Sequence, residues 1–186
     1  KTQATSPASH TEGEETTVTA RGGHAEGYQT LVEKQYAHAE GYHTSALGYY
    51  SHAEGRYSSA QGDSSHAEGY NTQARADYSH AGGQGTITSR VAQTAIGTFN
   101  ATNDNALFIV GKGSDADHPS NAFTVLEDGR ATIAKAPTNI MDVANKGYID
   151  DQLNKLKEAI IGTPVDHQVV SKLPSNPDSN TIYFIV

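Results

Sequence analysis

The sequence predicts a mainly β fold that begins with a parallel β-solenoid, in which the chain stacks one coil on the next. Two observations predict it: a strict 14-residue repeat and a shortage of large apolar side chains. The repeat carries a version of Ser-His-Ala-Glu-Gly around six evenly spaced histidines, which are His10, His24, His38, His52, His66 and His80. A drifted seventh copy occupies residues 93–97. A short fixed period is typical of proteins that stack one structural unit many times.

The composition indicates that a single chain has too few apolar side chains to form a normal hydrophobic core. Apolar residues make up 35% of the 186 residues, below the ~45–50% of ordinary globular domains. The large aliphatic residues before residue 90 are Val18, Leu31, Val32, Leu47 and Ile87. They are too few for a normal core in one copy of this segment, and a disordered chain has no reason to keep a strict period. We therefore expect an assembly in which several chains share the burial.

Each 14-residue unit divides into two halves, as in residues 51–57 and 58–64. In most halves, four or five residues suited to an extended strand precede a glycine, which can adopt the conformations that a corner needs. Two short strands and two corners then make one coil, and coils stack at about 4.8 Å. The third residue of each half is small or β-branched, and we expect it to face the inside of the coil because side chains alternate along a strand. These residues are Thr11, Ala25, Ala39, Ala53, Ala67, Ala81, Ala95, Val18, Val32, Ala46, Ala60, Ala74, Thr88 and Thr102.

The second and fourth residues of the first half should point outward, yet they hardly vary. They are His10, Glu12, His24, Glu26, His38, Glu40, His52, Glu54, His66, Glu68 and His80. The economical explanation is that this His–Glu ladder meets another chain, as the interface of a homotrimer. In the drifted copy Thr94 and Ile96 take the same places, and isoleucine prefers burial.

The repeat resembles the head repeats of YadA-like trimeric autotransporter adhesins, which carry a Ser-x-Ala-x-Gly motif twice per 14 residues. Its His-Ala-Glu-Gly version is similar to that of tail-fibre and other tail-appendage proteins of bacteriophages and prophages. The resemblance covers residues 9–97 and implies a trimeric left-handed parallel β-roll, with a repeat domain over residues 1–97.

The remaining chain is expected to form three further segments. Residues 98–136 should be a β connector with a hairpin at Asp128-Gly129, since Asp-Gly between alternating runs is a strong turn signal. Residues 137–162 should be a linker and a helix capped by Asp142 and ended by Gly162. Residues 163–186 should be a C-terminal β segment. The helix carries apolar residues spaced 4, 3 and 4 apart, the seam of a trimeric coiled coil. They are Ile149, Leu153, Leu156 and Ile160.

Two kinds of chemistry are open at the ladder. Histidine and glutamate two residues apart could chelate zinc or manganese, or they could form a hydrogen-bonded ladder that satisfies buried polar groups. The second is favoured, because a metal site needs three or four convergent ligands, although a trimer axis could supply three. We predict no metal, no cofactor and no catalytic residue, since a Ser-His triad needs a unique pocket.

Tyrosines recur near the two corners of successive coils. One row contains Tyr28, Tyr42 and Tyr70, and the other contains Tyr36, Tyr50 and Tyr78. Such rows could form a contact strip for carbohydrate or protein. The alternative, which we favour, is stacking between coils that shields the corners.

The formal net charge of −8 argues against nucleic acid as a partner. No stretch approaches the ~20 apolar residues of a membrane span, so we expect no membrane insertion. The predicted function is a non-enzymatic structural and adhesive fibre of a phage tail or baseplate, located in the virion. Its expected partners are its own trimer, other tail or baseplate proteins, and a host-surface glycan or protein. The alternatives are a head fragment of a bacterial surface adhesin at the cell surface and, third, a self-cleaving or glycan-degrading fibre.

Overall fold

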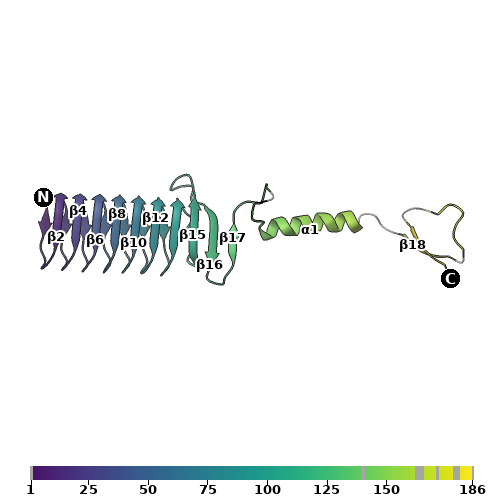
Figure 1. Cartoon of the computed structure of the whole chain (residues 1–186), viewed down its shortest axis with the longest axis horizontal. Helices are drawn as coiled ribbons and strands as arrows, with labels where there is room; N and C mark the ends of the chain where they lie inside the picture. Colours follow the sequence, from purple (N-terminus) through teal and green to yellow (C-terminus); the bar gives the residue numbers. More distant parts are fainter. Residues whose placement is uncertain (1, 140, 162–165, 171, 178–180, 186) are drawn as a thin grey trace. The chain divides into compact units, whose positions relative to one another are not determined.

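The computed structural model describes the chain except residues 1, 140, 162–165, 171, 178–180 and 186. The chain divides into two compact units, Lys1–Ala134 and Lys135–Val186. The first unit is the β-solenoid that the repeat predicts, with about eight turns of 14 residues, and it appears as the row of short arrows from purple to teal in Figure 1.

Each coil contributes one five-residue strand and one two-residue strand. The long strands are β2 (His10–Glu14), β4 (His24–Tyr28), β6 (His38–Tyr42), β8 (His52–Arg56), β10 (His66–Tyr70), β12 (His80–Gln84) and β14 (Thr94–Thr98). The short strands are β1 (Gln3–Ala4), β3 (Thr17–Val18), β5 (Leu31–Val32), β7 (Ser45–Ala46), β9 (Ser59–Ala60), β11 (Gln73–Ala74) and β13 (Ile87–Thr88). The short strands form one parallel sheet and the long strands form another. Equivalent residues of neighbouring coils are paired, so His10 lies opposite His24 and Gln3 opposite Thr17.

The inside of the coil is filled by the third residues of the two halves, as predicted. All of them from Val18 to Ala95 are fully buried, with 0% exposure. Hydroxyl residues add a second buried column; they are Thr16, Thr30, Thr44, Ser58, Thr72 and Thr86. At the ends the prediction is weaker. Thr11 is only half-buried, and the prediction for Thr102 is wrong because Thr102 is exposed. No strand forms in the described segment between β14 and residue 106, so Thr102 does not lie on a strand that faces the inside of a coil.

A column of glycines lies within the long strands. Gly27 and Gly41 have φ angles of +106° and +110°, in the region that favours glycine. A Cβ atom on Gly27 would lie 2.1 Å from the backbone oxygen of Gly41. The corner itself follows two residues later, where residues such as Tyr57 and Asn71 adopt φ angles of 58° and 55°. Glycine is therefore needed beside the corner for close approach of coils, and the corner residue can be of another type.

The roll continues one strand beyond the end that the sequence predicts. Strand β15 (Ala106–Lys112) pairs in parallel with β14, with Phe108 opposite Thr94 and Gly111 opposite Gly97. The 14-residue register is thus unbroken, and the predicted boundary between residues 97 and 98 comes one coil too early. Strands β16 (Asn121–Leu126) and β17 (Ala131–Ile133) then extend the sheet antiparallel. The turn at Asp128-Gly129 joins them, which confirms the predicted hairpin.

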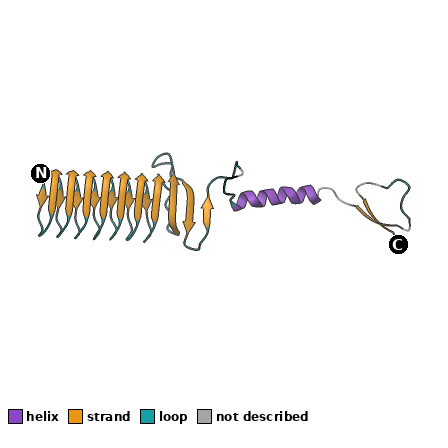
Figure 2. Cartoon of the chain, viewed as in Figure 1, coloured by secondary structure: helices purple, strands orange, loops and turns teal. Residues whose placement is uncertain are grey.

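The second unit contains a helix, purple in Figure 2, and two strands, which are orange. Helix α1 (Lys146–Ile161) confirms the predicted helix, but its cap is Asn145, whose Oδ1 accepts a hydrogen bond from the N–H of Tyr148 at 2.9 Å. The prediction that Asp142 caps the helix is wrong. Asp142 Oδ2 instead accepts hydrogen bonds from the N–H groups of Thr138 (2.8 Å) and Asn139 (2.9 Å), which closes the turn that precedes the helix. The predicted helix end at Gly162 lies outside the described residues.

The C-terminal β segment consists of β18 (Asp166–Val170) and β19 (Thr181–Ile185), which pair in parallel. The second of these strands was predicted from the sequence and the first was not. Among the residues that the structure describes, no helix has the length and apolar character needed to cross a membrane.

Candidate functional site

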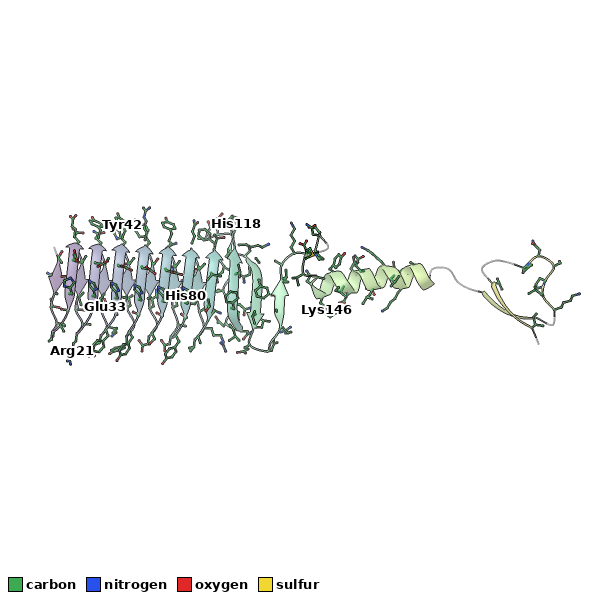
Figure 3. All side chains as sticks on the ribbon, in the orientation of Figure 1. Arg21, Glu33, Tyr42, His80, His118 and Lys146 are labelled. Carbon is green, nitrogen blue, oxygen red and sulfur yellow. The ribbon has the colours of Figure 1, made fainter. Side chains whose placement is uncertain are left out.

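The His–Glu ladder runs along the outer face of the long strands. The strand pairing places equivalent histidines side by side, and the rings of His24 and His38 stack with centroids 4.6 Å apart and planes 2° apart. The next pairs along the row, up to His80, keep centroid separations of 4.8, 4.9 and 5.0 Å. His10 at the first coil meets His24 edge-on, at 4.9 Å. Figure 3 labels His80 on the strand face, between the two edges where the coils turn.

The glutamates pair with this row in two different registers. Near the start of the roll, His24 faces the glutamate of its own coil, with Nε2 3.6 Å from Glu26. Further along, His66 faces the glutamate of the preceding coil, and its Nε2–H donates to Glu54 Oε1 at 3.2 Å. His80 donates in the same way to Glu68, at 3.1 Å.

The change of register leaves imidazole nitrogens unsatisfied. The buried Nε2 atoms of His24, His38 and His52 have no hydrogen-bond partner among the residues that the structure describes. His52 Nε2 approaches Glu40 to 3.5 Å without satisfying it. The ladder therefore satisfies its own polar groups only in its second part.

One chain leaves the ladder about one-third exposed. The side chains of His52 and Glu40 are 36% and 32% exposed, and His66 and Glu54 are 36% and 35% exposed. From His24 onward the predicted ladder residues lie on one continuous, half-buried surface, whereas His10 and Glu12 in the first coil are exposed. The role of this surface as a trimer interface stays a prediction.

Within the described residues, two groups on this surface bring together three metal-ligating side chains. They are His24, Glu26 and His38, and His52, Glu54 and His66; in each group the ligand atoms all lie within 4.8 Å of one another. Each group offers two imidazole nitrogens and one carboxylate oxygen. The ladder therefore contains convergent ligands within one chain. From the sequence, we expected three such ligands to converge only at a trimer axis.

Aromatic side chains line one corner of the roll. Tyr28 and Tyr42 stack with centroids 5.1 Å apart, and Tyr42 contacts His43 at 4.4 Å and Tyr57 at 5.6 Å. The Glu15 carboxylate near Tyr28 raises the pKa of that phenol above its usual value. Figure 3 labels Tyr42 at the edge where the long strands end.

Arg56 completes this corner in the one coil between Tyr28 and Tyr70 that has no tyrosine at the corresponding position. Its guanidinium carbon lies 5.5 Å from the ring centroid of Tyr42, 5.1 Å from that of Tyr57 and 5.6 Å from that of Tyr70. These distances fit cation–π contacts. We use the term aromatic strip for the set Tyr28, Tyr42, His43, Arg56, Tyr57 and Tyr70. Sequence reasoning missed His43, Arg56 and Tyr57, although Arg56 occupies the tyrosine position of its coil and the other two follow that position directly.

The second predicted row is only partly formed. Tyr36 and Tyr50 stack at 5.5 Å. Tyr78 is 66% exposed and makes no ring contact with another described residue, because Ser64 occupies the intervening coil. The favoured interpretation, stacking between coils, holds for the first pair and not for Tyr78.

The apolar seam of helix α1 is uncovered in one chain. Ile149, Leu153 and Leu156 are 45%, 49% and 56% exposed, and the side chain of the fourth seam residue, Ile160, lies outside what the structure describes. Large apolar side chains in a row on a short helix are typical of a surface that a partner helix covers.

Comparison with known proteins gives no relative on which to base a function: no family model matches the chain, and no curated protein matches it.

Proposed function

We propose that this protein is a structural and adhesive fibre component of a bacteriophage tail or baseplate, and that it acts as a homotrimeric shaft in attachment to the host surface. The observation that carries the proposal is the His–Glu ladder, a half-buried surface that repeats from coil to coil with the same residue types. A surface of stacked, identical elements suits lengthwise contact between parallel chains. Many copies of one site suit a shaft better than an enzyme, whose triad or metal centre is assembled once.

The seam of helix α1 supports the same assembly from the other unit. Ile149, Leu153 and Leu156 would be covered if three helices packed in parallel, as the ladder would be if three rolls did. In such a trimer, neighbouring chains would cover both the polar ladder and the apolar seam. Stacked coils joined by continuous parallel ladders give the shaft its stiffness.

The mass of the protein in solution tests the proposal. Light scattering coupled to gel filtration should give three times the 19.7 kDa of one chain. A monomer at the same concentration would contradict the shaft, because the ladder and the seam would then stay uncovered. The genomic setting tests the phage assignment: flanking tail genes would support it, and a gene that encodes a membrane-anchored adhesin would contradict it.

The aromatic strip is the surface that we propose for contact with a host glycan or protein. Its rings and the Arg56 guanidinium form an amphipathic surface, and tyrosine is well suited to contacts that are apolar on the face and polar at the tip. We expect Tyr42→Ala to reduce the binding of labelled protein to susceptible bacterial cells severalfold. Tyr78→Ala is the matched control, since this tyrosine is outside the strip. Equal loss in both variants, or none in either, would exclude the strip as the contact surface.

A further inference from the structure

The His–Glu ladder holds more than a trimer contact. Its first group, His24, Glu26 and His38, presents two buried Nε2 atoms without a described hydrogen-bond partner. Leaving such atoms unpaired costs free energy, and the nearest carboxylate, Glu26, is 3.6 Å from His24 Nε2. A bound cation would satisfy both nitrogens and the carboxylate together.

The separation of the ligand atoms is close to what a metal ion needs. Zinc binds histidine nitrogen and carboxylate oxygen at about 2.0–2.2 Å, so tetrahedral ligands lie roughly 3.3–3.5 Å from one another. The ligand atoms of each group already lie within 4.8 Å of one another. Rotation of side chains that are one-third exposed can close the remaining gap without moving the strands, whose pairing fixes the histidine Cα atoms.

The chemical types of the ligands indicate which ion the ladder suits. Two imidazoles and one carboxylate match Zn²⁺ and other divalent transition metals better than Mg²⁺ or Ca²⁺, which prefer oxygen ligands throughout. The partial exposure of the ladder in one chain leaves room for a fourth ligand.

We propose that each chain binds two Zn²⁺ ions, one at His24, Glu26 and His38 and one at His52, Glu54 and His66. This inference goes beyond the proposed function, since it concerns the residues of one chain. The first site binds more tightly. Both of its imidazole nitrogens are unpartnered, whereas at the second site His66 must first give up its hydrogen bond to Glu54.

Zinc titration of the full chain tests this proposal. After removal of metal with a chelator, calorimetry at pH 7.5 should give two Zn²⁺ ions per chain with different affinities. His38→Ala should abolish the tighter event and leave one ion, and His66→Ala should abolish the weaker one. His118→Ala is the control, since His118 lies outside the ladder in the loop before β16, and it should keep both events.

Glu26→Gln provides a second test that keeps the histidine stack intact. It should weaken the tighter event at least tenfold while the circular dichroism spectrum stays that of the wild type. Binding of less than one ion per chain, or a stoichiometry unchanged by His38→Ala and Glu26→Gln, would overturn the proposal. The mass of the same samples separates this outcome from the proposed function: a metal-free trimer would remove only the zinc sites, and a monomer with two ions would remove only the shaft.

Discussion

At the residue scale, the glycine column sets how closely coils can stack. Gly41 has a φ angle of +110°, and a Cβ atom there would lie 2.1 Å from the backbone oxygen of Gly55. An alanine would therefore be strained by its own backbone conformation and would also clash with the next coil. Neither problem has a local remedy, because the neighbouring atom belongs to the backbone ladder.

We expect Gly41→Ala to lower the free energy of unfolding of the roll by roughly 2–4 kcal/mol. Urea unfolding followed by far-UV circular dichroism measures the change. Gly147→Ala is the matched control, since its new Cβ atom would lie 3.6 Å from Asn145 Oδ1 in ordinary contact, and alanine stabilises a helix by about 0.5–1 kcal/mol over glycine. A roll that tolerates Gly41→Ala as well as the helix tolerates its alanine would show that the coils are not in close contact at this column.

Asp142 is a second residue whose role is specific. The N–H groups of Thr138 and then Asn139 hold the pKa of its carboxyl below the usual value. A carboxyl with a lowered folded-state pKa stabilises the fold above its unfolded-state pKa, and the stabilisation is lost as the pH falls through the folded-state pKa. We expect the amide NMR signals of Thr138 and Asn139 to report one acid transition below the usual aspartate range. Asp142→Asn should remove that transition; its persistence would assign it to another group.

At the element scale, inward-facing residues proved more informative than the motif itself. In strand β15, Phe108 and Val110 stand at the histidine and glutamate positions of the repeat. The motif is therefore not recognisable there in the sequence. Ile109 nevertheless takes the buried alanine place and Gly111 takes the glycine place. The buried inward residue and the glycine that allows close approach are the residues that a coil requires. The outward residues depend on which surface the coil contacts. This is why the sequence predicted the solenoid and the ladder but ended the roll too early.

The features that could not be predicted from the sequence depend on contacts between different strands. Strand β18 has no repeat, and its pairing with β19 is visible only in three dimensions. The change in histidine–glutamate register between His24 and His66 also leaves no trace in the His-Ala-Glu-Gly sequence, which is identical at both places. The change in register is a difference in side-chain rotation, which cannot be predicted residue by residue from the repeat.

The start of helix α1 offers a direct test at this scale. Asn145→Ala removes the acceptor of the Tyr148 N–H hydrogen bond and should destabilise the helix by about 1 kcal/mol. The loss is measured as a lower helical signal at 222 nm and a lower melting temperature of that signal. Asp142→Ala is the counterpart: if it lowers the helical signal as much as Asn145→Ala does, the cap is assigned to the wrong residue.

At the scale of the whole molecule, the two units present different surfaces for the same proposed symmetry. The roll presents a polar ladder, and a polar surface repeated in register fixes how far one chain can slide past another. The helix presents an apolar seam, which contributes association energy with less demand on register. In the proposed trimer, therefore, the ladder would determine alignment and the seam would contribute affinity.

This division predicts what a charge in the seam should do. Leu153→Asp places a carboxylate where three helices would meet, next to the same charge from two other chains, and desolvation and repulsion both oppose association. We expect the variant to dissociate at protein concentrations at least tenfold higher than the wild type, measured by light scattering over a dilution series.

Asn154→Asp is the matched control for that variant. It introduces the same charge on the adjacent residue, away from the seam, so its mass should follow that of the wild type at every concentration. If the two variants dissociate alike, the loss comes from net charge and the seam does not hold the chains together. If both remain trimeric at every dilution, the ladder alone supplies the affinity, and the helix contributes no more than the link to the C-terminal strands.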